Sequence, residues 1–163
     1  MRYLLALLML LAPLSVRADL IACTQMWCQE GLTVNLQSTA PSGAPAASWP
    51  AGDYIFKIKA DDKSYICTGK LPFADCDSGV TCDAEGVTIG ASGCALLKDQ
   101  HFFNSVMLQH ANVKHIDLDI MRSDGKKFTF STDVAAQCSY PNGEQCDSQQ
   151  CCSAVLDAVV EWK

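Results

Sequence analysis

The chain has 163 residues, 49% of them hydrophobic, with ten cysteines and a formal net charge of −6. The acidic balance excludes nucleic acid as an expected partner, because phosphate binding needs a basic surface, and it disfavours docking on anionic lipid. Ten cysteines favour an oxidising compartment and up to five disulfides.

The first eighteen residues have the features of a secretory signal peptide. Arg2 supplies the positive charge, residues 4–14 form the apolar run, and residues 16–18 offer small side chains for cleavage. The run is shorter than the roughly 20 residues of a membrane span, so we expect no transmembrane segment. Cleavage leaves ten Lys/Arg against eighteen Asp/Glu, a net charge of −8. We predict a secreted or periplasmic protein with one domain over residues 19–163.

A lipid anchor is the alternative to simple secretion. Residues 20–23, Leu-Ile-Ala-Cys, are similar to a bacterial lipobox, which would acylate Cys23 and tether the protein to the outer envelope. However, Arg17 and Asp19 separate the apolar run from Cys23. Lipidation would also leave nine cysteines, one of them unpaired. Both points favour secretion without an anchor.

The cysteines are interpreted as a disulfide framework, although zinc is the competing use of paired cysteines. No pair has the C-x2-C spacing of structural zinc sites. Ten cysteines allow about 945 pairings, so the connectivity stays open. The expected disulfide residues are Cys23, Cys28, Cys67, Cys76, Cys82, Cys94, Cys138, Cys146, Cys151 and Cys152.

Short spacings suggest local bridges. We expect Cys23 to pair with Cys28 and Cys146 with Cys151, and a longer bridge such as Cys67 to Cys94 would close about 28 residues. Adjacent cysteines at 151 and 152 project differently. One should therefore close the local loop of the tail, residues 138–152, while the other reaches back to Cys138 or to the main domain. The tail would pin the last strand.

Alternation of apolar and polar residues predicts strands over 32–36, 54–59, 64–68, 115–122 and 127–131. Short apolar runs predict others over 87–89, 94–97 and 106–108. Residues 61–63 and the pair Asp124-Gly125 have the composition of hairpin turns. The run 154–162 fits a strand, with Leu156, Ala158, Val160 and Trp162 on one face; a helix would instead gather Val155, Ala158, Val159 and Trp162. The neighbouring valines favour the strand.

About eight short strands without a convincing helix predict an all-β protein, a disulfide-stapled antiparallel β-sandwich. An immunoglobulin-like or prealbumin-like arrangement is favoured, and a small β-barrel is the alternative. Residues 38–48, rich in Pro, Ser, Ala and Gly, are expected to form a surface loop.

Two clusters of polar residues could bind a metal ion. Asp75, Asp77, Asp83 and Glu85 make an acidic loop that could offer oxygens to calcium, but the EF-hand pattern fails and a disulfide-pinned turn is favoured. His115, Asp117 and Asp119 share one face of a predicted strand, with His110 nearby. Alternation with buried Ile and Leu makes a solvated face the better interpretation.

No catalytic motif and no cofactor motif was found. His101, His110 and His115 are the only histidines available as a general base, and none lies in a recognised motif.

Several short motifs resemble those of uncharacterised cysteine-rich secreted proteins and lipoproteins of myxobacteria and related bacteria. The shared elements are Pro-Ala-Gly-Asp-Tyr at 50–54, Cys67 followed by Leu71-Pro72, the turn at 122–125, and Tyr-Pro-Asn-Gly-x-x-Cys at 140–146. The doublet Cys151-Cys152 and the extra Cys138 depart from that pattern. The resemblance implies a β-sandwich protein of the cell envelope and transfers no catalytic residue.

The sequence thus predicts an exported, non-enzymatic binding or structural module of the cell envelope or secretome, with an unknown protein or glycan as its partner. A calcium- or metal-dependent adhesion-type module and a secreted hydrolase using His110 or His115 are the alternatives.

Overall fold

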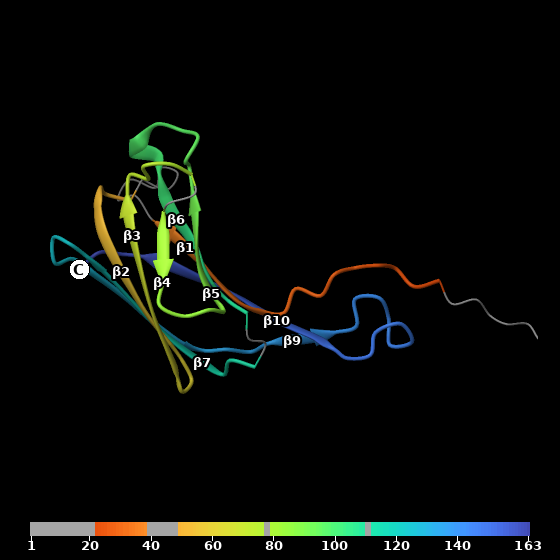
Figure 1. The fold of residues 1–163 in the computed structure, drawn as a ribbon. Coiled ribbons are helices and arrows are strands. Elements are labelled where there is room, and N and C mark those ends of the chain that lie inside the picture. The colour runs from red at the N-terminus through yellow and green to blue at the C-terminus, as the bar shows by residue number, and fades with distance from the viewer. Residues whose placement is uncertain (1–21, 39–48, 77–78, 110–111) are drawn as a thin grey trace, which may run out of the picture.

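The structure, a computed structural model, describes residues 22–38, 49–76, 79–109 and 112–163. Ten strands lie in this part of the chain (Figure 1): β1 (Gly31–Ser38), β2 (Gly52–Ala60), β3 (Lys63–Leu71), β4 (Val80–Cys82), β5 (Val87–Ser92), β6 (Phe102–Leu108), β7 (His115–Arg122), β8 (Lys127–Asp133), β9 (Gln137–Ser139) and β10 (Cys151–Val160). A 3-10 turn, η2 (Lys98–Gln100), precedes β6.

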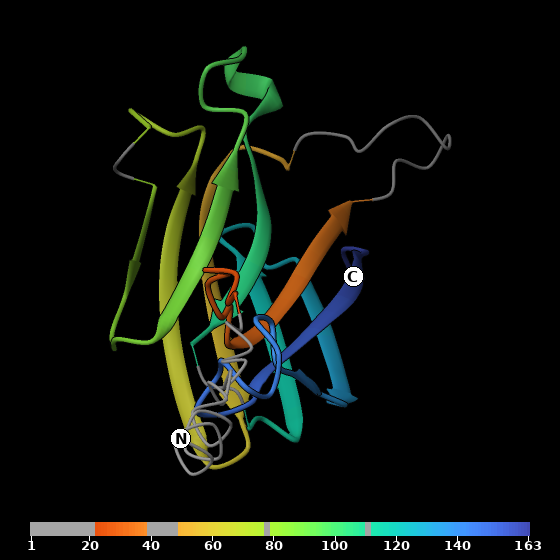
Figure 2. The ribbon, with the colours of Figure 1, turned by 90° about the vertical axis from the view of Figure 1, so that its right-hand side faces the viewer.

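The strands form two five-stranded sheets that pack face to face (Figures 1 and 2). Sheet A has the order β5-β6-β1-β10-β9, and sheet B has the order β4-β3-β2-β7-β8. Neither sheet closes on itself, so the predicted β-sandwich is confirmed and the barrel alternative is wrong. All pairs are antiparallel except one, in which β1 runs parallel to β10 from Gly31 beside Ser153 to Ser38 beside Val160.

Most predicted strands are confirmed because their alternation matches the buried face. In β10, Ala154, Ala158 and Val160 are buried while Val155 and Val159 are exposed, so the final run is a strand rather than a helix. The strand predicted over 94–97 is wrong. Gly93 has a positive φ of +83° and turns the chain away before η2. Strands β4 and β9 were not predicted, since three residues are too few to show alternation.

The turns of two hairpins depend on aspartates. Asp61 adopts a positive φ of +51° after β2, and its carboxylate accepts hydrogen bonds from the backbone N–H groups of Lys114 and His115, at 3.1 and 3.0 Å. It thereby fixes the start of β7. In the hairpin of β7 and β8, only Gly125 has a positive φ, whereas Asp124 accepts a hydrogen bond from the N–H of Lys126.

An aromatic cluster fills the centre of the sandwich. The ring of Phe103 lies 5.1 Å from Phe56, 5.2 Å from Trp49 and 5.3 Å from Tyr54, measured between ring centroids. Trp162, just beyond β10, packs on Trp49 at 5.4 Å. Edge-to-face contacts of this kind add to the burial of the rings, so the cluster joins the two sheets.

Tyr54 places its hydroxyl group inside this cluster and is fully buried. The hydroxyl donates a hydrogen bond to the carbonyl oxygen of Pro50, which keeps it paired. Burial raises the pKa of Tyr54 to about 12, although Arg122 nearby lowers it in part. The hydroxyl group of Tyr54 therefore stays protonated at neutral pH.

All ten cysteines are paired, and the local pairings predicted for the chain are wrong. The five bonds are Cys23–Cys146, Cys28–Cys151, Cys67–Cys82, Cys76–Cys94 and Cys138–Cys152. The expected bonds of Cys23 with Cys28 and of Cys146 with Cys151 are absent because the N-terminal segment and the tail lie side by side and bond to each other. The bond of Cys67 with Cys94 is absent because Cys67 lies opposite Cys82 on β4. Of the pairings considered for the doublet, the one from Cys152 to Cys138 is present.

Two disulfides attach the shortest edge strands. Cys67 on β3 is directly opposite Cys82 on β4, and Cys138 on β9 is directly opposite Cys152 on β10, each with a Cα–Cα distance of 4.0 Å. A three-residue strand contributes few ladder hydrogen bonds by itself. The bonds therefore hold β4 and β9 at the sheet edges, where short strands protect against association with other chains.

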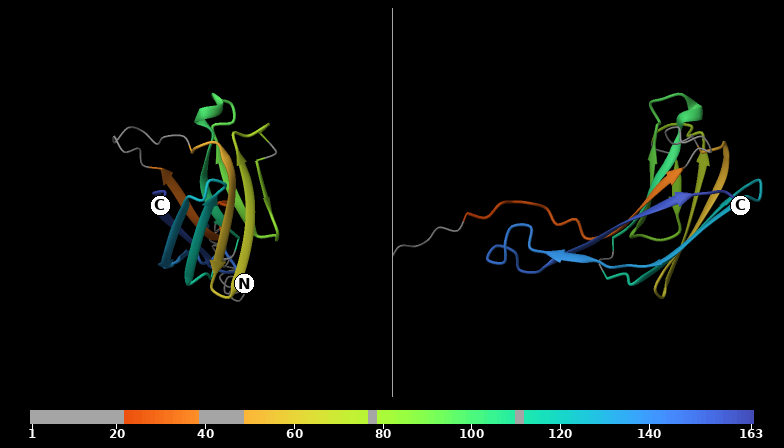
Figure 3. Two further views of the ribbon diagram at one scale, coloured as in Figure 1. Left: turned by 90° about the vertical axis from the view of Figure 1, so that its left-hand side faces the viewer. Right: turned by 180° about the vertical axis from the view of Figure 1, so that it is seen from behind.

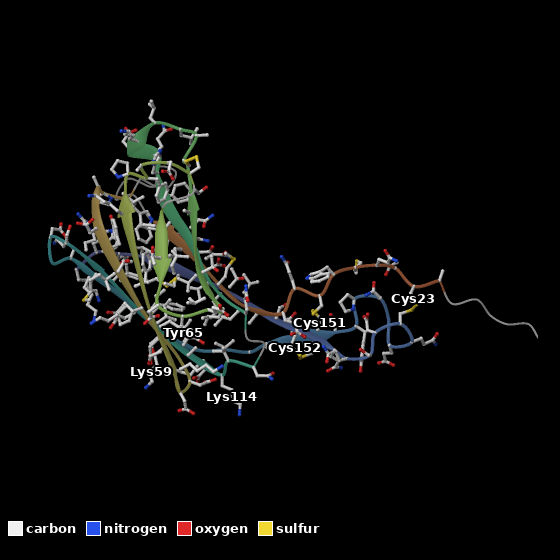
Figure 4. All side chains as sticks on the ribbon, in the orientation of Figure 1. Cys23, Lys59, Tyr65, Lys114, Cys151 and Cys152 are labelled. Carbon is white, nitrogen blue, oxygen red and sulfur yellow. A yellow bond between two sulfur atoms is a disulfide. The ribbon has the colours of Figure 1, made fainter. Side chains whose placement is uncertain are left out.

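Two segments that are far apart in the sequence form an arm beside the sandwich. We define the arm as residues 22–30 and 138–153; it projects from the base of the sandwich in opposite views (Figures 1 and 3). Cys23 lies toward its outer end, and Cys151 and Cys152 lie near its root (Figure 4). Three of the five disulfides join cysteines of the arm. Two tie the N-terminal segment to the tail, at Cys146 and at Cys151 on β10, and the third ties β9 to the last strand, β10, in sheet A, as one of the predicted pairings of the doublet required.

Candidate functional site

The acidic loop is spread along the edge of sheet B. Asp83 accepts a hydrogen bond from the N–H of Ile66 at 2.9 Å, which extends the pairing of β3 and β4. Asp75 and Glu85 are exposed, and Asp77 lies outside the described residues. The bonds Cys67–Cys82 and Cys76–Cys94 hold the loop at both ends. In the described part of the chain, no group of three or more His, Cys, Asp or Glu side chains is placed to hold a metal ion.

The three histidines have different surroundings. His101 is buried, its ring stacks on Phe73 at 5.2 Å, and its Nδ1 accepts a hydrogen bond from the N–H of Phe73. This is a structural role in the core. His110 falls outside the described residues. His115 lies on the outer face of sheet B, where its ring is hydrogen-bonded to other polar side chains.

Four side chains on β7 and β8 form a hydrogen-bonded polar ladder, comprising His115, Asp117, Ser131 and Asp133. His115 Nδ1 donates to Asp133 at 2.7 Å, and His115 Nε2 lies 3.2 Å from both Asp117 and Ser131. Ser131 donates to Asp117 at 2.6 Å. Cross-strand pairing of His115 with Asp133 and of Asp117 with Ser131 brings these residues together. Asp119, which the sequence grouped with them, instead pairs with Lys127.

The polar ladder has the residue types of a hydrolytic triad but a different arrangement. Hydrogen bonds that His115 donates to Asp133, and then to Asp117, raise the pKa of His115 above its usual value of 6.5. The hydrogen bonds from Ser131 and His115 lower the pKa of Asp117. In a triad the serine proton is directed to the imidazole, which acts as the general base, whereas here Ser131 donates its proton to Asp117. The geometry therefore favours a charged surface network over the hydrolase alternative.

The titration of His115 checks this interpretation. We expect its NMR midpoint to lie above 6.5 and to fall in Asp133→Asn, because the largest cause of the raised pKa is removed. A raised pKa contributes stability that is complete below the unfolded value near 6.5 and is lost as the pH rises through the folded value. Solvent screening keeps this contribution small, since Asp133 is 93% exposed. Asp119→Asn is the matched control on the same face; an unchanged midpoint in Asp133→Asn would contradict the assignment.

The arm presents the most exposed large apolar side chain in the described residues. Trp27 is 91% exposed and its neighbour Met26 is 57% exposed. Both line a groove of about 650 Å³ formed by the N-terminal segment, the end of β6 and the tail, which we call the arm groove. Its volume is in the range of small-molecule sites. An exposed indole at such a position is unusual, because tryptophan is highly buried on average.

Asn142 holds the N-terminal segment in place. Its side-chain amide accepts a hydrogen bond from the N–H of Met26 at 2.6 Å and donates one to the carbonyl oxygen of Met26 at 3.0 Å, so it mimics a paired strand. Asp147 accepts from both the backbone and the side chain of Asn142 at 2.8 Å. The Pro-Asn-Gly segment of the tail is thus a clamp on residues 24–26.

The polar lining of the arm groove consists mostly of neutral side chains, with two carboxylates. The described residues that line it include no lysine, arginine or histidine, and the carboxylate of Asp147 accepts hydrogen bonds from Asn142. Glu30 is the other carboxylate of the lining. The remaining polar side chains are Gln29, Gln109, Asn142, Ser148, Gln149 and Gln150. The surface combines one aromatic ring with a set of neutral amides.

A second hollow of about 370 Å³ lies at the turn between β2 and β3, lined by Asp61, Tyr65 and Val113 among others. Figure 4 shows Tyr65 with Lys59 and Lys114 in this region, away from the arm. Its carboxylate, Asp61, already caps the start of β7. This hollow is therefore explained by the architecture of the hairpin, and the arm groove is the stronger candidate site.

Sequence reasoning missed Trp27 because the segment around it was interpreted only through the expected bond between Cys23 and Cys28. The signal in the sequence is that polar and apolar residues do not alternate around Trp27, so the pattern assigns this side chain to no buried strand face. No protein-family model, curated protein or solved structure matches the chain. Within the described residues, none of the helical structure is long and apolar enough to span a lipid bilayer.

Proposed function

We propose that this protein is an exported, non-enzymatic binding module of the cell envelope or secretome, and that the arm groove is its contact site. The observation that carries the proposal is Trp27, 91% exposed on a segment that two disulfides and a hydrogen-bonded clamp hold in place. Fixed, exposed aromatic side chains dominate the binding energy of many interfaces, because little entropy is lost when they are covered.

Export is supported by the five disulfides, which indicate an oxidising, extracytoplasmic environment. Secretion without a lipid anchor is supported by the bond between Cys23 and Cys146, since acylation requires the free thiol of Cys23. A role outside catalysis is supported by the imidazole of His115, which has a carboxylate partner at each nitrogen.

Retention on cell-envelope material from the source organism tests the proposal. The labelled mature protein should be retained, and Trp27→Ala should reduce the apparent affinity at least about tenfold, as for a tryptophan at the centre of an interface. Leu97→Ala is the matched control, because Leu97 is also exposed, at 69%, but lies near η2 rather than on the arm. Both variants should keep the wild-type melting temperature. Failure of the wild type to be retained, or equal effects of the two substitutions, would overturn the proposed site.

A further inference from the structure

We propose that the ligand of the arm groove is an uncharged glycan chain, with Trp27 stacked on a sugar ring and the glutamine amides bonded to its hydroxyl groups. This inference rests on the proposed function and names the chemical class of the ligand. It follows from three properties of the groove: the donors and acceptors that line it, its charge, and the support of Trp27.

The donors and acceptors of the arm groove match those of a sugar. Four of the lining residues are glutamines, at positions 29, 109, 149 and 150. Each side-chain amide presents donors and an acceptor side by side, as neighbouring hydroxyl groups of a pyranose do. Among the described residues these four amides make no side-chain hydrogen bond to the rest of the protein, so they are available to a ligand.

The indole of Trp27 supplies the apolar half of sugar recognition. The two faces of a pyranose differ, since axial C–H groups collect on one side and leave it apolar. An aromatic face carries negative charge density and attracts these slightly positive hydrogens. At 91% exposure both faces of the ring are open. The amides of Gln149 and Gln150 lie on the lining of the same groove.

The charge of the groove argues against the other ligand classes. The described residues of the lining include no cationic side chain that could pair with phosphate, sulfate or uronate groups. A basic peptide would pair with carboxylates of the lining, but both oxygens of Asp147 already accept hydrogen bonds from Asn142, which leaves Glu30 as the carboxylate best placed to meet a cationic group. A neutral, hydroxyl-rich ligand needs neither a cationic nor an anionic partner in the groove.

The support of Trp27 reduces the cost of binding. Cys23–Cys146 and Cys28–Cys151 fix the segment on both sides of Trp27, and Asn142 pairs with the backbone of Met26 between them. A ligand therefore meets a preorganised segment, and the ordering entropy that weakens binding by loose loops is already lost. This suits glycans, whose exposed hydrogen bonds each contribute little.

The test separates the chemistry of the ligand from the existence of binding. The full mature protein is applied to envelope material that is untreated, digested with protease, or oxidised with periodate, which cleaves vicinal diols. We expect retention to survive protease, to be lost after periodate, and to be competed by soluble neutral glycan released from the same material. Retention that is lost to protease and survives periodate would overturn the glycan assignment and leave the binding module intact. No retention on untreated material would overturn both.

Substitutions in the arm groove give a second, independent readout. Trp27→Phe keeps a stacking face and should bind within about threefold of wild type, whereas Trp27→Leu should lose at least about tenfold. A purely apolar protein contact would tolerate both alike, and that result would overturn stacking. Gln149→Ala combined with Gln150→Ala should lose about tenfold, as two hydrogen bonds are removed. Gln137→Ala, on β9 outside the groove, is the matched control and should bind as wild type.

Discussion

Removing the Cys28–Cys151 bridge alone should lower the free energy of unfolding by about 3 kcal/mol, whereas removing it together with Cys23–Cys146 should lower it by about 8 kcal/mol. Both bridges join residues separated by 123 positions. In the unfolded chain, either bridge closes the same large loop, which contributes about 5 kcal/mol by chain entropy. The second bridge then closes only a ring of about twelve residues and adds about 3 kcal/mol.

Equilibrium urea unfolding of alanine variants measures these values. The control is Cys138→Ala with Cys152→Ala, which opens a separate local loop and should cost about 3 kcal/mol in any background. Two single removals of about 5 kcal/mol each would show that the bridges act independently, and would contradict their parallel arrangement. The single removals decide the question even where the variant lacking both bridges is unfolded in water, as the total stability of a domain is about 5–15 kcal/mol.

Phe103→Ala should lower the free energy of unfolding by about 4 kcal/mol, because it opens a cavity at the centre of the sandwich. Phe103, on β6 of sheet A, is fully buried, and its ring contacts aromatic rings of β2 in sheet B and of the segment after β3. Phe102→Ala is the matched control. Phe102 is only half-buried at the edge of the core, and its replacement should cost clearly less. Equal losses from the two variants in thermal or urea unfolding would contradict the assigned centre of the core.

Gly69 provides a further test of the same contact. A methyl group added at this position would lie 2.7 Å from Cζ of Phe103. Gly69→Ala should therefore cost about 2 kcal/mol in the wild type, as expected for overpacking. In the Phe103→Ala background the obstacle is gone, so the same substitution should cost little or nothing. A double-mutant cycle measures this coupling.

The sequence predicted the long strands well because each has one buried and one solvated face. It predicted neither β4 nor β9, whose positions depend on cysteines opposite them on β3 and β10. The pairing of Cys23 with Cys146 could not be read from spacing, since the two segments meet only after β1 and β10 have paired in parallel. Local pairings were expected because they close short loops. The observed pairings instead follow from which strands and segments lie side by side in the folded sheets.

The candidate site was less predictable than the fold. The polar residues of β7 were assigned correctly to one strand face, but their partners Ser131 and Asp133 come from the register of β8. The arm groove is built from three stretches that are far apart in the sequence. The Pro-Asn-Gly segment entered the sequence analysis only as part of the motif at 140–146, and only the structure shows that its asparagine clamps Met26.

The parallel pairing of β1 and β10 also has a consequence for biosynthesis. The first strand to be synthesised, β1, lies in the middle of sheet A beside the last strand, β10. Sheet A therefore stays incomplete until about residue 160 has been synthesised. Contacts this distant in sequence form slowly. Cys23 and Cys28 likewise have no native partner until Cys146 and Cys151 have been synthesised, whereas Cys67–Cys82 and Cys76–Cys94 have both partners much earlier. The bonds of the arm are therefore the last that the chain can complete.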